Sequence, residues 1–449
     1  MTESYDLIVI GSGPAGYVAA ERAGEAGRRV LLVEREPVLG GVCLNWGCIP
    51  TKTLLNCAKI FHYAGHGQAF GVSATPQFDF AAAQARKQKV VGQLNVGVAG
   101  LMKRAKVTVV TGQAQLVDAT TVAVGDQRYS AAHILVCSGS RPSRPPIPGL
   151  DLAHVVDSTG ILALERLPQS LVVIGGGVIG LEFAHFFASV GVAVTVVEML
   201  DQIAGATDLD CARTLRQALE QHGITIHTQA RVTAITAEHV AFTDRKGQDQ
   251  QAAADCVLVA TGRTPNVEGL GLEQVGVALE RGRIVIDERC RTNVPSIWAA
   301  GDCTGKALLA HVASRQAEVA VAAMAGGPDR MRYHAVPAVI YTTPEVACVG
   351  LSEAEAKAQG RAVLTAKLPM SVSGRFLAEH DDRGLVKVVV DAQTRALIGV
   401  HMVGATCSEM IFGAAAMIES QARVDEIKQT IFPHPTVSEV IREAMFALR

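Results

Sequence analysis

The chain has few aromatic residues, no long apolar run and almost no net charge. Phe, Trp and Tyr make up 4% of its 449 residues, and no stretch reaches the roughly 18 uninterrupted apolar residues of a transmembrane helix. Lys and Arg number 41 against 43 Asp and Glu, so there is no broad basic field for nucleic acid or an anionic membrane. We therefore expect no nucleic-acid partner and no membrane association.

Other signals are also missing. Cys and His do not occur at metal-site spacings, so we expect no bound metal, and no low-complexity tract is present. Residues 1–5 carry no basic stretch leading into an apolar run, so we expect a cytoplasmic location. Ten cysteines would be awkward there as structural disulfides. We predict that most are small core residues: Cys57, Cys137, Cys211, Cys256, Cys290, Cys303, Cys348 and Cys407.

Glycine and aliphatic residues are abundant. The chain has 43 glycines and 49% hydrophobic residues. This composition is typical of α/β proteins, in which buried parallel strands use Val, Ile and Leu and dinucleotide-binding turns use Gly. A length of 449 residues predicts two or three domains.

A glycine loop near the amino terminus has the order of a dinucleotide-binding unit. In such units the glycines let backbone amides approach a pyrophosphate, and an acidic residue holds a ribose hydroxyl. Glycines alone would also suit an ordinary turn, but the strand, helix and acid around them favour a dinucleotide. The unit comprises a strand at residues 5–10, the loop Gly11, Gly13 and Gly16, a helix at 17–26, a strand at 30–33 and Glu34.

The same order recurs later in the chain, which predicts a second dinucleotide. Each unit is followed by an apolar strand that ends in Gly139 or Gly262, and we expect these strands to close the two domains. The second unit comprises a strand at residues 171–174, the loop Gly175, Gly177 and Gly180, a helix at 181–190, a strand at 192–197 and Glu198.

Cys43 and Cys48 follow the first glycine loop and are separated by four residues, so their thiols can close a small ring. Cys48 opens a predicted helix with Pro50 in its first turn, and a helix start favours thiolate. Alone, the two residues would equally suit buried structural cysteines. Next to a dinucleotide loop they indicate flavin-linked disulfide chemistry.

With these motifs, nearly the whole chain resembles the class I pyridine nucleotide-disulfide oxidoreductases, and among them the dihydrolipoyl dehydrogenase group. The resemblance rests on the cysteine motif at residues 40–52, a second flavin segment at 292–302, a segment at 344–351 that resembles the start of a dimerisation domain, and residues 432–439. It implies FAD and NAD as cofactors, a homodimer, and a lipoyl-bearing carrier protein or free dihydrolipoamide as partner.

The resemblance assigns residues to each cofactor. NAD is preferred over NADP, because Glu198 would repel a 2′-phosphate and no Arg or Lys follows it within residues 199–202. The implied FAD residues are Gly11, Gly13, Gly16, Glu34, Gly41, Lys52, Gly112, Gly139, Asp302 and Ala310. The implied NAD residues are Gly175, Gly177, Gly180, Glu198 and Gly262.

The resemblance also implies catalytic roles. Cys43 exchanges with the substrate, Cys48 lies against the flavin, and Lys52 pairs with Glu182. Thiol exchange needs a base, and imidazole titrates in the right range. The resemblance supplies this base as His434, oriented by Glu439, from the opposite subunit. Phe432 stands where the family often has a second histidine, but no reacting group is lost.

The predicted fold is α/β, with two Rossmann-like dinucleotide-binding domains as in glutathione reductase and a C-terminal α+β dimerisation domain. We expect an FAD domain at residues 1–145 and 270–335, an NAD domain at 146–269 and a dimerisation domain at 336–449. The prolines of residues 141–149 predict a linker that no helix or strand includes.

The predicted function is an NAD-dependent oxidoreductase that oxidises the dihydrolipoyl groups of a carrier through Cys43, Cys48 and FAD. Two alternatives stay open. One is an NAD(P)H-dependent reductase of another low-molecular-weight disulfide. The other is a flavoprotein subunit with mainly a binding role.

Overall fold

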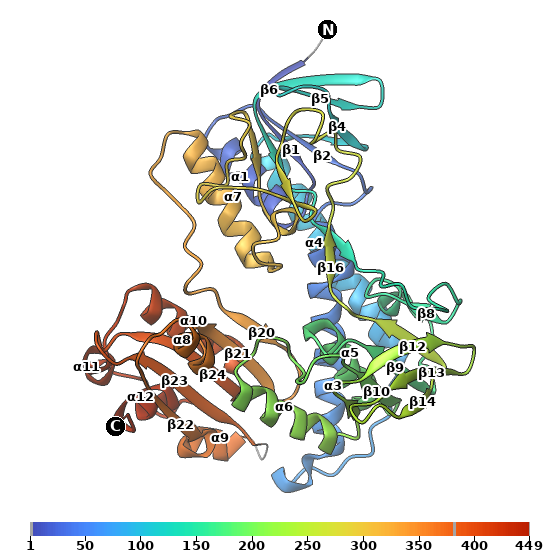
Figure 1. Cartoon of the computed structure of the whole chain (residues 1–449), viewed down its shortest axis with the longest axis vertical. Coiled ribbons are helices and arrows are strands. Elements are labelled where there is room, and N and C mark those ends of the chain that lie inside the picture. The colour runs from blue at the N-terminus through green and yellow to red at the C-terminus, as the bar shows by residue number, and fades with distance from the viewer. Residues whose placement is uncertain (1–2, 380–382, 449) are drawn as a thin grey trace. The chain divides into compact units, whose positions relative to one another are not determined.

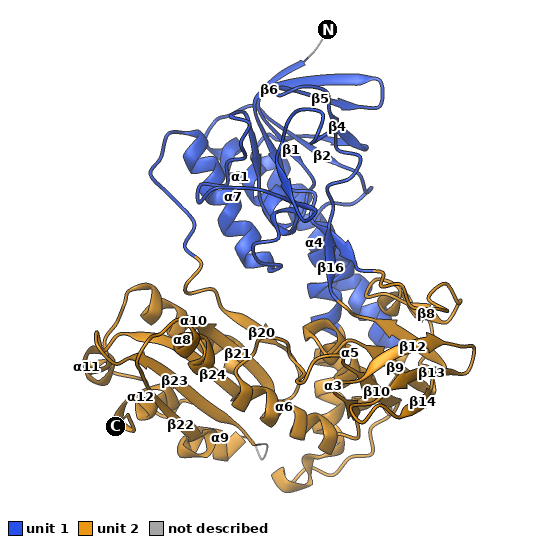
Figure 2. Ribbon diagram, in the orientation of Figure 1, with its two compact units in different colours: residues 1–53, 82–143, 262–332 blue, residues 54–81, 144–261, 333–449 orange. Residues whose placement is uncertain are grey.

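The computed structural model describes residues 3–379 and 383–448, which divide into two compact units (Figure 2). Each unit is assembled from segments that lie far apart in the sequence. Within the described residues, the first unit takes in 1–53, 82–143 and 262–332, and the second takes in 54–81, 144–261 and 333–449.

The first unit is built on a largely parallel sheet that includes β1, β2 and β6 (Figure 1). Its strand order is β3-β2-β1-β6-β5-β4, and β19 also pairs with β6. The centre of β1 is inaccessible to solvent at Leu7, Ile8 and Val9, which explains its continuous apolar sequence. The strands are β1 (Glu3–Ile10), β2 (Val30–Glu34), β3 (Thr108–Thr111), β4 (Ala114–Leu116), β5 (Thr121–Val124), β6 (Gln127–Val136) and β19 (Ile297–Ala299).

Helices α1 and α7 of the first unit pack against each other. The helices α3 and α4 each contribute residues to both units. The helices with residues in the first unit are α1 (Pro14–Glu25), α2 (Gly41–Trp46), α3 (Cys48–Gly65), α4 (Phe80–Arg104), α7 (Ala310–Met324) and the short 3₁₀ helix η3 (Asp302–Thr304).

The second unit contains a parallel sheet of order β11-β10-β9-β15-β8 and an antiparallel sheet of order β12-β13-β14. Its central strand β9 is buried, and the glycine loop that follows it leads into α5. These elements are β8 (Val155–Val156), β9 (Ser170–Ile174), α5 (Val178–Ser189), β10 (Ala193–Val197), α6 (Leu209–Gln221), β11 (Thr225–His227), β12 (Arg231–Ile235), β13 (His239–Thr243), β14 (Asp249–Ala253) and β15 (Cys256–Val259).

The carboxyl-terminal part of the second unit is an antiparallel sheet of order β20-β21-β24-β23-β22 with its own hydrophobic core. We call it the interface sheet. The predicted antiparallel strands at residues 385–390 and 397–403 are β23 and β24. The elements are β20 (Ala338–Ile340), β21 (Glu345–Gly350), α8 (Glu353–Ala358), β22 (Val363–Pro369), α9 (Gly374–Glu379), β23 (Leu385–Asp391), β24 (Leu397–Gly404), α10 (Cys407–Glu419), α11 (Val424–Gln429) and α12 (Glu439–Phe446).

The predicted linker at residues 141–149 is wrong at its start. Ser140–Pro142 forms β7, which pairs with β16 (Arg263–Pro265) in a two-stranded antiparallel ladder. Each proline lies at a strand end of this ladder, where a missing N–H group removes no hydrogen bond from a sheet interior.

The α/β class is confirmed. Each of the two units contains a sheet with a strand that leads into a glycine loop, and the second unit also contains an antiparallel α+β part. The predicted three-domain boundaries stay a prediction. Among the described ranges, no helix combines the length and apolar composition needed to cross a bilayer.

Candidate active site

The first glycine loop connects β1 to α1, and two of its glycines are required by close backbone contacts. A Cβ atom on Gly11, which has φ +96°, would lie 2.4 Å from the carbonyl oxygen of Cys137. A Cβ atom on Gly16 would lie 1.8 Å from the carbonyl oxygen of Gly11. A Cβ atom on Gly13 would meet no other atom within 4 Å. The loop is therefore closely packed at Gly11 and Gly16 and open at Gly13, which fits the close approach of a pyrophosphate.

Glu34 ends β2 beside this loop and is held there by backbone amides. Its Oε2 atom accepts hydrogen bonds from the Ser12 amide at 2.7 Å and the Ser12 hydroxyl at 2.6 Å. The Gly112 amide donates to the Glu34 carbonyl at 2.8 Å. The fixed carboxylate stands at the carboxyl end of a parallel strand, where a ribose hydroxyl is bound in such sheets.

A second group of polar residues gathers at η3 in the same unit. Asp302 accepts a hydrogen bond from the Ser140 hydroxyl at 2.5 Å, and the Arg263 Nε atom donates to that hydroxyl at 2.7 Å. Ser140 follows Gly139, which has φ +69° and open space beside it. Ala310 is the first residue of α7. Asp302, Gly139 and Ala310 were predicted for FAD, whereas Ser140 and Arg263 were missed.

The cysteine pair is packed directly against the first glycine loop. Cys43 lies in α2 and Cys48 opens α3. Gly41, the first residue of α2, has φ +59°, and a Cβ atom there would lie 2.6 Å from the Cα atom of Gly13. The backbone contact between Gly41 and Gly13 brings the two predicted features, thiol pair and nucleotide loop, into one site.

The side chains of Cys43 and Cys48 are in hydrogen-bonding contact. The hydrogen bond with Cys48 raises the pKa of Cys43, burial raises it further, and the nearby Lys52 cation opposes both effects. Cys43 therefore keeps its proton at neutral pH. Because the thiolate is the nucleophile in thiol exchange, Cys43 needs an external base in order to react.

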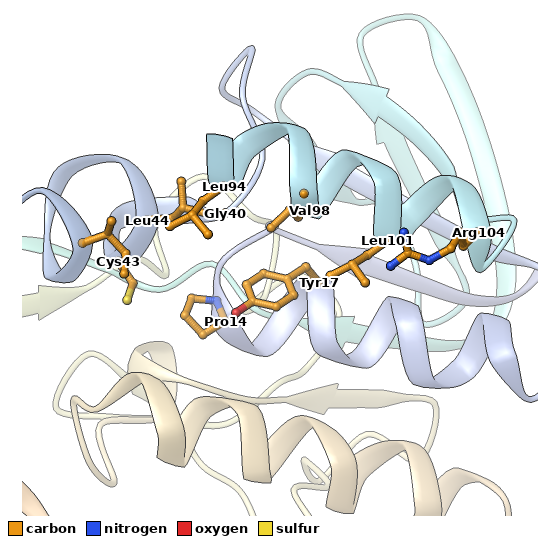
Figure 3. A pocket seen from close by; sticks show the side chains of 11 residues that line it. Pro14, Tyr17, Gly40, Cys43, Leu44, Leu94, Val98, Leu101 and Arg104 are labelled. Atoms are coloured by element: carbon orange, nitrogen blue, oxygen red, sulfur yellow. The ribbon is translucent and has the colours of Figure 1, made fainter. Parts of the chain in front are cut away.

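A cavity of about 460 Å³ opens beside Cys43 (Figure 3). Its walls are mostly hydrocarbon, from Pro14 and Tyr17 of α1 and from α4, and Arg104 lines one end. Burial, followed by the neighbouring Cys43, raises the pKa of Tyr17, so its hydroxyl stays protonated. The α4 wall and Tyr17 were not predicted from the sequence, although Tyr17 directly follows Gly16. The cavity fits a small substrate with an apolar chain.

Lys52 and Glu182 lie in different units, and their predicted pairing stays a prediction. Lys52 lies one helical turn after Cys48 in α3 and is half-buried. Glu182 in α5 is 2% exposed, and its Oε1 atom accepts a hydrogen bond from the Tyr341 amide at 3.0 Å.

The second glycine loop repeats the geometry of the first. A Cβ atom on Gly175 would lie 2.5 Å from the carbonyl oxygen of Ala260, and one on Gly180 would lie 2.0 Å from the carbonyl oxygen of Gly175. A Cβ atom on Gly177 would lie in open space. Glu198 is buried and accepts hydrogen bonds from the amides of Gly176 at 2.6 Å and Leu200 at 2.7 Å. This loop also fits a dinucleotide. Gly262, with φ +111°, belongs to the first unit.

His434 and Glu439 lie together at the start of α12. The Nδ1 atom of His434 lies 3.0 Å from Oε1 of Glu439, and Oε2 of the same carboxylate accepts a hydrogen bond from the Thr436 amide. These two bonds, the amide first, lower the pKa of Glu439. An ionised carboxylate only accepts, so Nδ1 carries the proton and Nε2 of the neutral ring is left to take one. The His434 side chain is 80% exposed, so it is open to a substrate.

Residues 5–317 match the sequence profile of the pyridine nucleotide-disulphide oxidoreductases, and residues 336–445 match the dimerisation domain of the same proteins. The chain belongs to this family. It is 40% identical to "Dihydrolipoyl dehydrogenase" of Rhizobium etli, over 99% of this chain and 98% of that one. It is also 40% identical to the protein of the same name from Geobacillus stearothermophilus, over 98% and 95%.

Solved structures of the family have the same fold. LpdA from Mycobacterium tuberculosis superposes with a TM-score of 0.90 at 29% identity, over 98% of this chain and 99% of that one. The HOCl-induced flavoprotein disulfide reductase RclA from Escherichia coli gives 0.87 at 30% identity, over 98% and 99%. The predicted resemblance is confirmed: the chain is a flavoprotein disulfide oxidoreductase with FAD and NAD(H) as cofactors, and its dimerisation domain indicates a homodimer.

Proposed function

We propose that this oxidoreductase is an NAD-dependent dihydrolipoyl dehydrogenase, which oxidises the dihydrolipoyl groups of a carrier protein or free dihydrolipoamide. The names of its relatives support the substrate. The observation that carries the proposal is the Cys43–Cys48 thiol contact, placed against the Gly13 loop and opening onto an apolar cavity.

Each residue of the site has a separate role in the proposed reaction. Cys43 lines the cavity, so it is the thiol that exchanges with the substrate. The incoming dihydrolipoyl thiol must lose its proton to attack the Cys43–Cys48 disulfide. The raised pKa of Cys43 means that its sulfur also needs a proton when it is released. We assign this proton transfer to Nε2 of His434, whose tautomer is fixed by Glu439. We place the histidine and the cysteines of one site on opposite subunits, which makes the dimer the catalytic unit.

The first loop would hold FAD through Gly11, Gly13, Gly16, Glu34 and Asp302, and Cys48 would lie against it. Bound FAD supplies two-electron transfer between a dithiol and a nicotinamide, chemistry that no side chain provides. The protein contributes the geometry around the sulfurs and the exclusion of water by the apolar walls of the cavity.

We also propose that NAD is preferred over NADP. Both carboxylate oxygens of Glu198 are anchored by backbone amides, so the negative charge is fixed beside the second loop. The next residues, Met199 and Leu200, are exposed and apolar, and no cation within residues 199–202 would attract a 2′-phosphate.

We also propose that the protein is located in the cytoplasm. Apart from the redox pair, most of the cysteines are buried as small core residues. Such use of cysteine is usual in a reducing compartment.

One comparison of activities tests the function. We expect turnover of dihydrolipoamide with NAD and little or none of glutathione disulfide with NADPH. The reverse order would favour the alternative, a reductase of another low-molecular-weight disulfide. Bound flavin without either activity would favour a subunit with a binding role.

A further inference from the structure

A second group of sulfur and imidazole side chains lies in the second unit, where α6 packs against the interface sheet. Cys211 is in the first turn of α6, Cys348 is in β21 and His401 is in β24. Cys211 and His401 are buried and Cys348 is half-buried. These residues have no part in the proposed reaction.

Cys348 and His401 are opposite each other on neighbouring antiparallel strands, so their side chains share one face of the sheet. The Nε2 atom of His401 lies 3.0 Å from the Leu351 carbonyl oxygen, which can only accept a hydrogen bond. In the neutral ring Nδ1 is therefore unprotonated. That atom is buried and has no hydrogen-bond partner among the described residues, so it is available to take a proton.

The charges of this group favour a thiolate at Cys348. Burial lowers the pKa of His401, but interactions with the Cys348 thiol and the Leu351 carbonyl raise it overall. Hydrogen bonding from the Cys211 thiol is the largest cause that lowers the pKa of Cys348 below that of an ordinary thiol, against the opposing effect of burial. His401 and the Asp208 backbone add to the lowering. The Cys348 sulfur is thus close to a thiol, an imidazole and the amino end of a helix.

An ion cluster holds the amino end of α6 against the interface sheet. The buried Lys387 Nζ atom lies 3.0 Å from Asp208, 2.9 Å from Asp210 and 3.0 Å from Glu353. Lys367 also pairs with Asp210, at 2.9 Å. These contacts keep Cys211, one turn into the helix, beside Cys348.

A metal ion does not account for this arrangement, since no His, Cys, Asp or Glu cluster in the described ranges has the geometry to hold one. We propose that Cys211 and Cys348 are a second redox pair, in which hydrogen peroxide oxidises Cys348 and Cys211 then closes an intrachain disulfide between α6 and β21.

The chemistry balances with one peroxide. The Cys348 thiolate attacks a peroxide oxygen, an S–O bond forms, the O–O bond breaks, and the leaving hydroxide takes the proton released by Cys348 to give water. Cys348 loses two electrons and the peroxide gains them. Cys211 sulfur then attacks the sulfenic acid, an S–S bond forms, the S–O bond breaks, and the Cys211 proton leaves with the oxygen as a second water.

The cross-link is tested on the holoenzyme with Cys43 and Cys48 already joined, so that they cannot consume the oxidant. After hydrogen peroxide treatment and nonreducing digestion, we expect a disulfide-linked peptide pair containing Cys211 and Cys348. In Cys211→Ser, dimedone should label Cys348. Cys256→Ser, a buried cysteine of β15, is the matched control and should cross-link as the wild type does.

Absence of this peptide pair in the wild type, or a predominant link to the nearby Cys407, would overturn the proposal. A second measurement needs no variant. Because the thiolate reacts with iodoacetamide, alkylation of Cys348 should have a midpoint below that of an ordinary thiol, whereas burial raises the pKa of Cys256 to about 11 and leaves it unreactive at neutral pH. In His401→Gln the Cys348 midpoint should rise. A wild-type midpoint near that of an ordinary thiol, about 8.5, would contradict the proposal.

Discussion

Cys43 and Cys48 differ in what surrounds them, and this difference supports the separate roles proposed for them. Cys43 faces the cavity and holds its proton, because hydrogen bonding to Cys48 and burial raise its pKa. Cys48 begins α3, where the positive end of the helix dipole favours a negative sulfur. This asymmetry supports the proposed roles, in which Cys43 exchanges with the substrate and Cys48 lies against the flavin.

Replacing either sulfur should therefore stop turnover without removing the cofactor. We expect Cys43→Ser and Cys48→Ser to reduce NAD with dihydrolipoamide only at background rate, because no exchangeable disulfide can form. Their flavin absorbance should match the wild type. Cys256→Ser, distant in sequence and buried in β15, serves as control and should retain activity. Wild-type turnover by Cys48→Ser would contradict the proposed function.

The two glycine loops supply a matched pair of substitutions. Gly13 and Gly177 both have open space where a Cβ atom would lie and backbone angles that alanine adopts, with φ −64° and −79°. We expect Gly13→Ala to lower flavin content and Gly177→Ala to raise KM for NAD with flavin content unchanged. Unfolding free energies should shift by no more than about 0.5 kcal/mol.

The contrast is Gly16→Ala, whose Cβ atom would lie 1.8 Å from the Gly11 carbonyl oxygen. This variant should fail to fold or should lose far more stability than Gly13→Ala in thermal unfolding. Full flavin content in Gly13→Ala would show that the open face of the first loop does not receive the cofactor.

At the scale of whole elements, both glycine units were predictable. The predicted strand at residues 30–33 is β2 (Val30–Glu34), and the predicted strand at 192–197 is β10 (Ala193–Val197). Apolar runs, glycines and a terminal acid are local signals, so they place an element without knowledge of its neighbours. The predicted resemblance supplied the roles of the remaining site residues, such as Asp302.

Local sequence signals cannot predict contacts between segments that lie far apart in the sequence. The Arg263–Ser140–Asp302 hydrogen bonds join residues more than 120 positions apart, and the α4 wall of the cavity is far in sequence from Cys43. Periodicity shows that α4 is a helix but not which site it lines. The strand β7 was missed for a related reason, since only its pairing with β16 makes it a strand.

The Lys387 ion cluster joins α6 to the interface sheet and should be important for stability. Lys387→Met would leave Asp208, Asp210 and Glu353 without their shared cation, and breaking such a buried network costs up to about 3–5 kcal/mol. Lys367→Met is the control, because its Lys367–Asp210 pair is largely exposed and worth about 0–1 kcal/mol. Unfolding by denaturant measures both.

The carboxylates of the Lys387 ion cluster determine how the stability of the fold changes with pH. The pKa values of Asp210 and Glu353 are lowered in the folded chain, chiefly by hydrogen bonds from Lys367, Lys387 and Lys357. Their stabilisation is therefore present above their unfolded pKa values of about 4 and is lost as the pH falls below them. The stability gap between wild type and Lys387→Met should be largest near neutral pH and shrink in acid. A gap that widens in acid would contradict this assignment.

At the scale of the whole molecule, the arrangement of the two subunits decides where the base comes from. We expect His434→Gln to lower kcat roughly 10²–10⁴-fold, the range for loss of a general base. If the histidine of one subunit serves the cysteines of the other, a heterodimer of Cys43→Ser and His434→Gln chains has one intact site. It should show about half the wild-type activity.

Differently tagged chains, purified together from co-expression, make this measurement. The homodimers of each variant are the controls and should be inactive. No recovery in the heterodimer would place the histidine and cysteines of each site in the same chain.

The cavity beside Cys43 also limits how a large partner can be served. A volume of about 460 Å³ admits a ring and a short hydrocarbon tether, but not a folded module. The carrier protein of the proposed function would therefore have to reach the sulfurs with a flexible arm while its body remains outside. Because only the arm would contact the reacting atoms, any discrimination among carriers would have to be made on the outer surface of the enzyme.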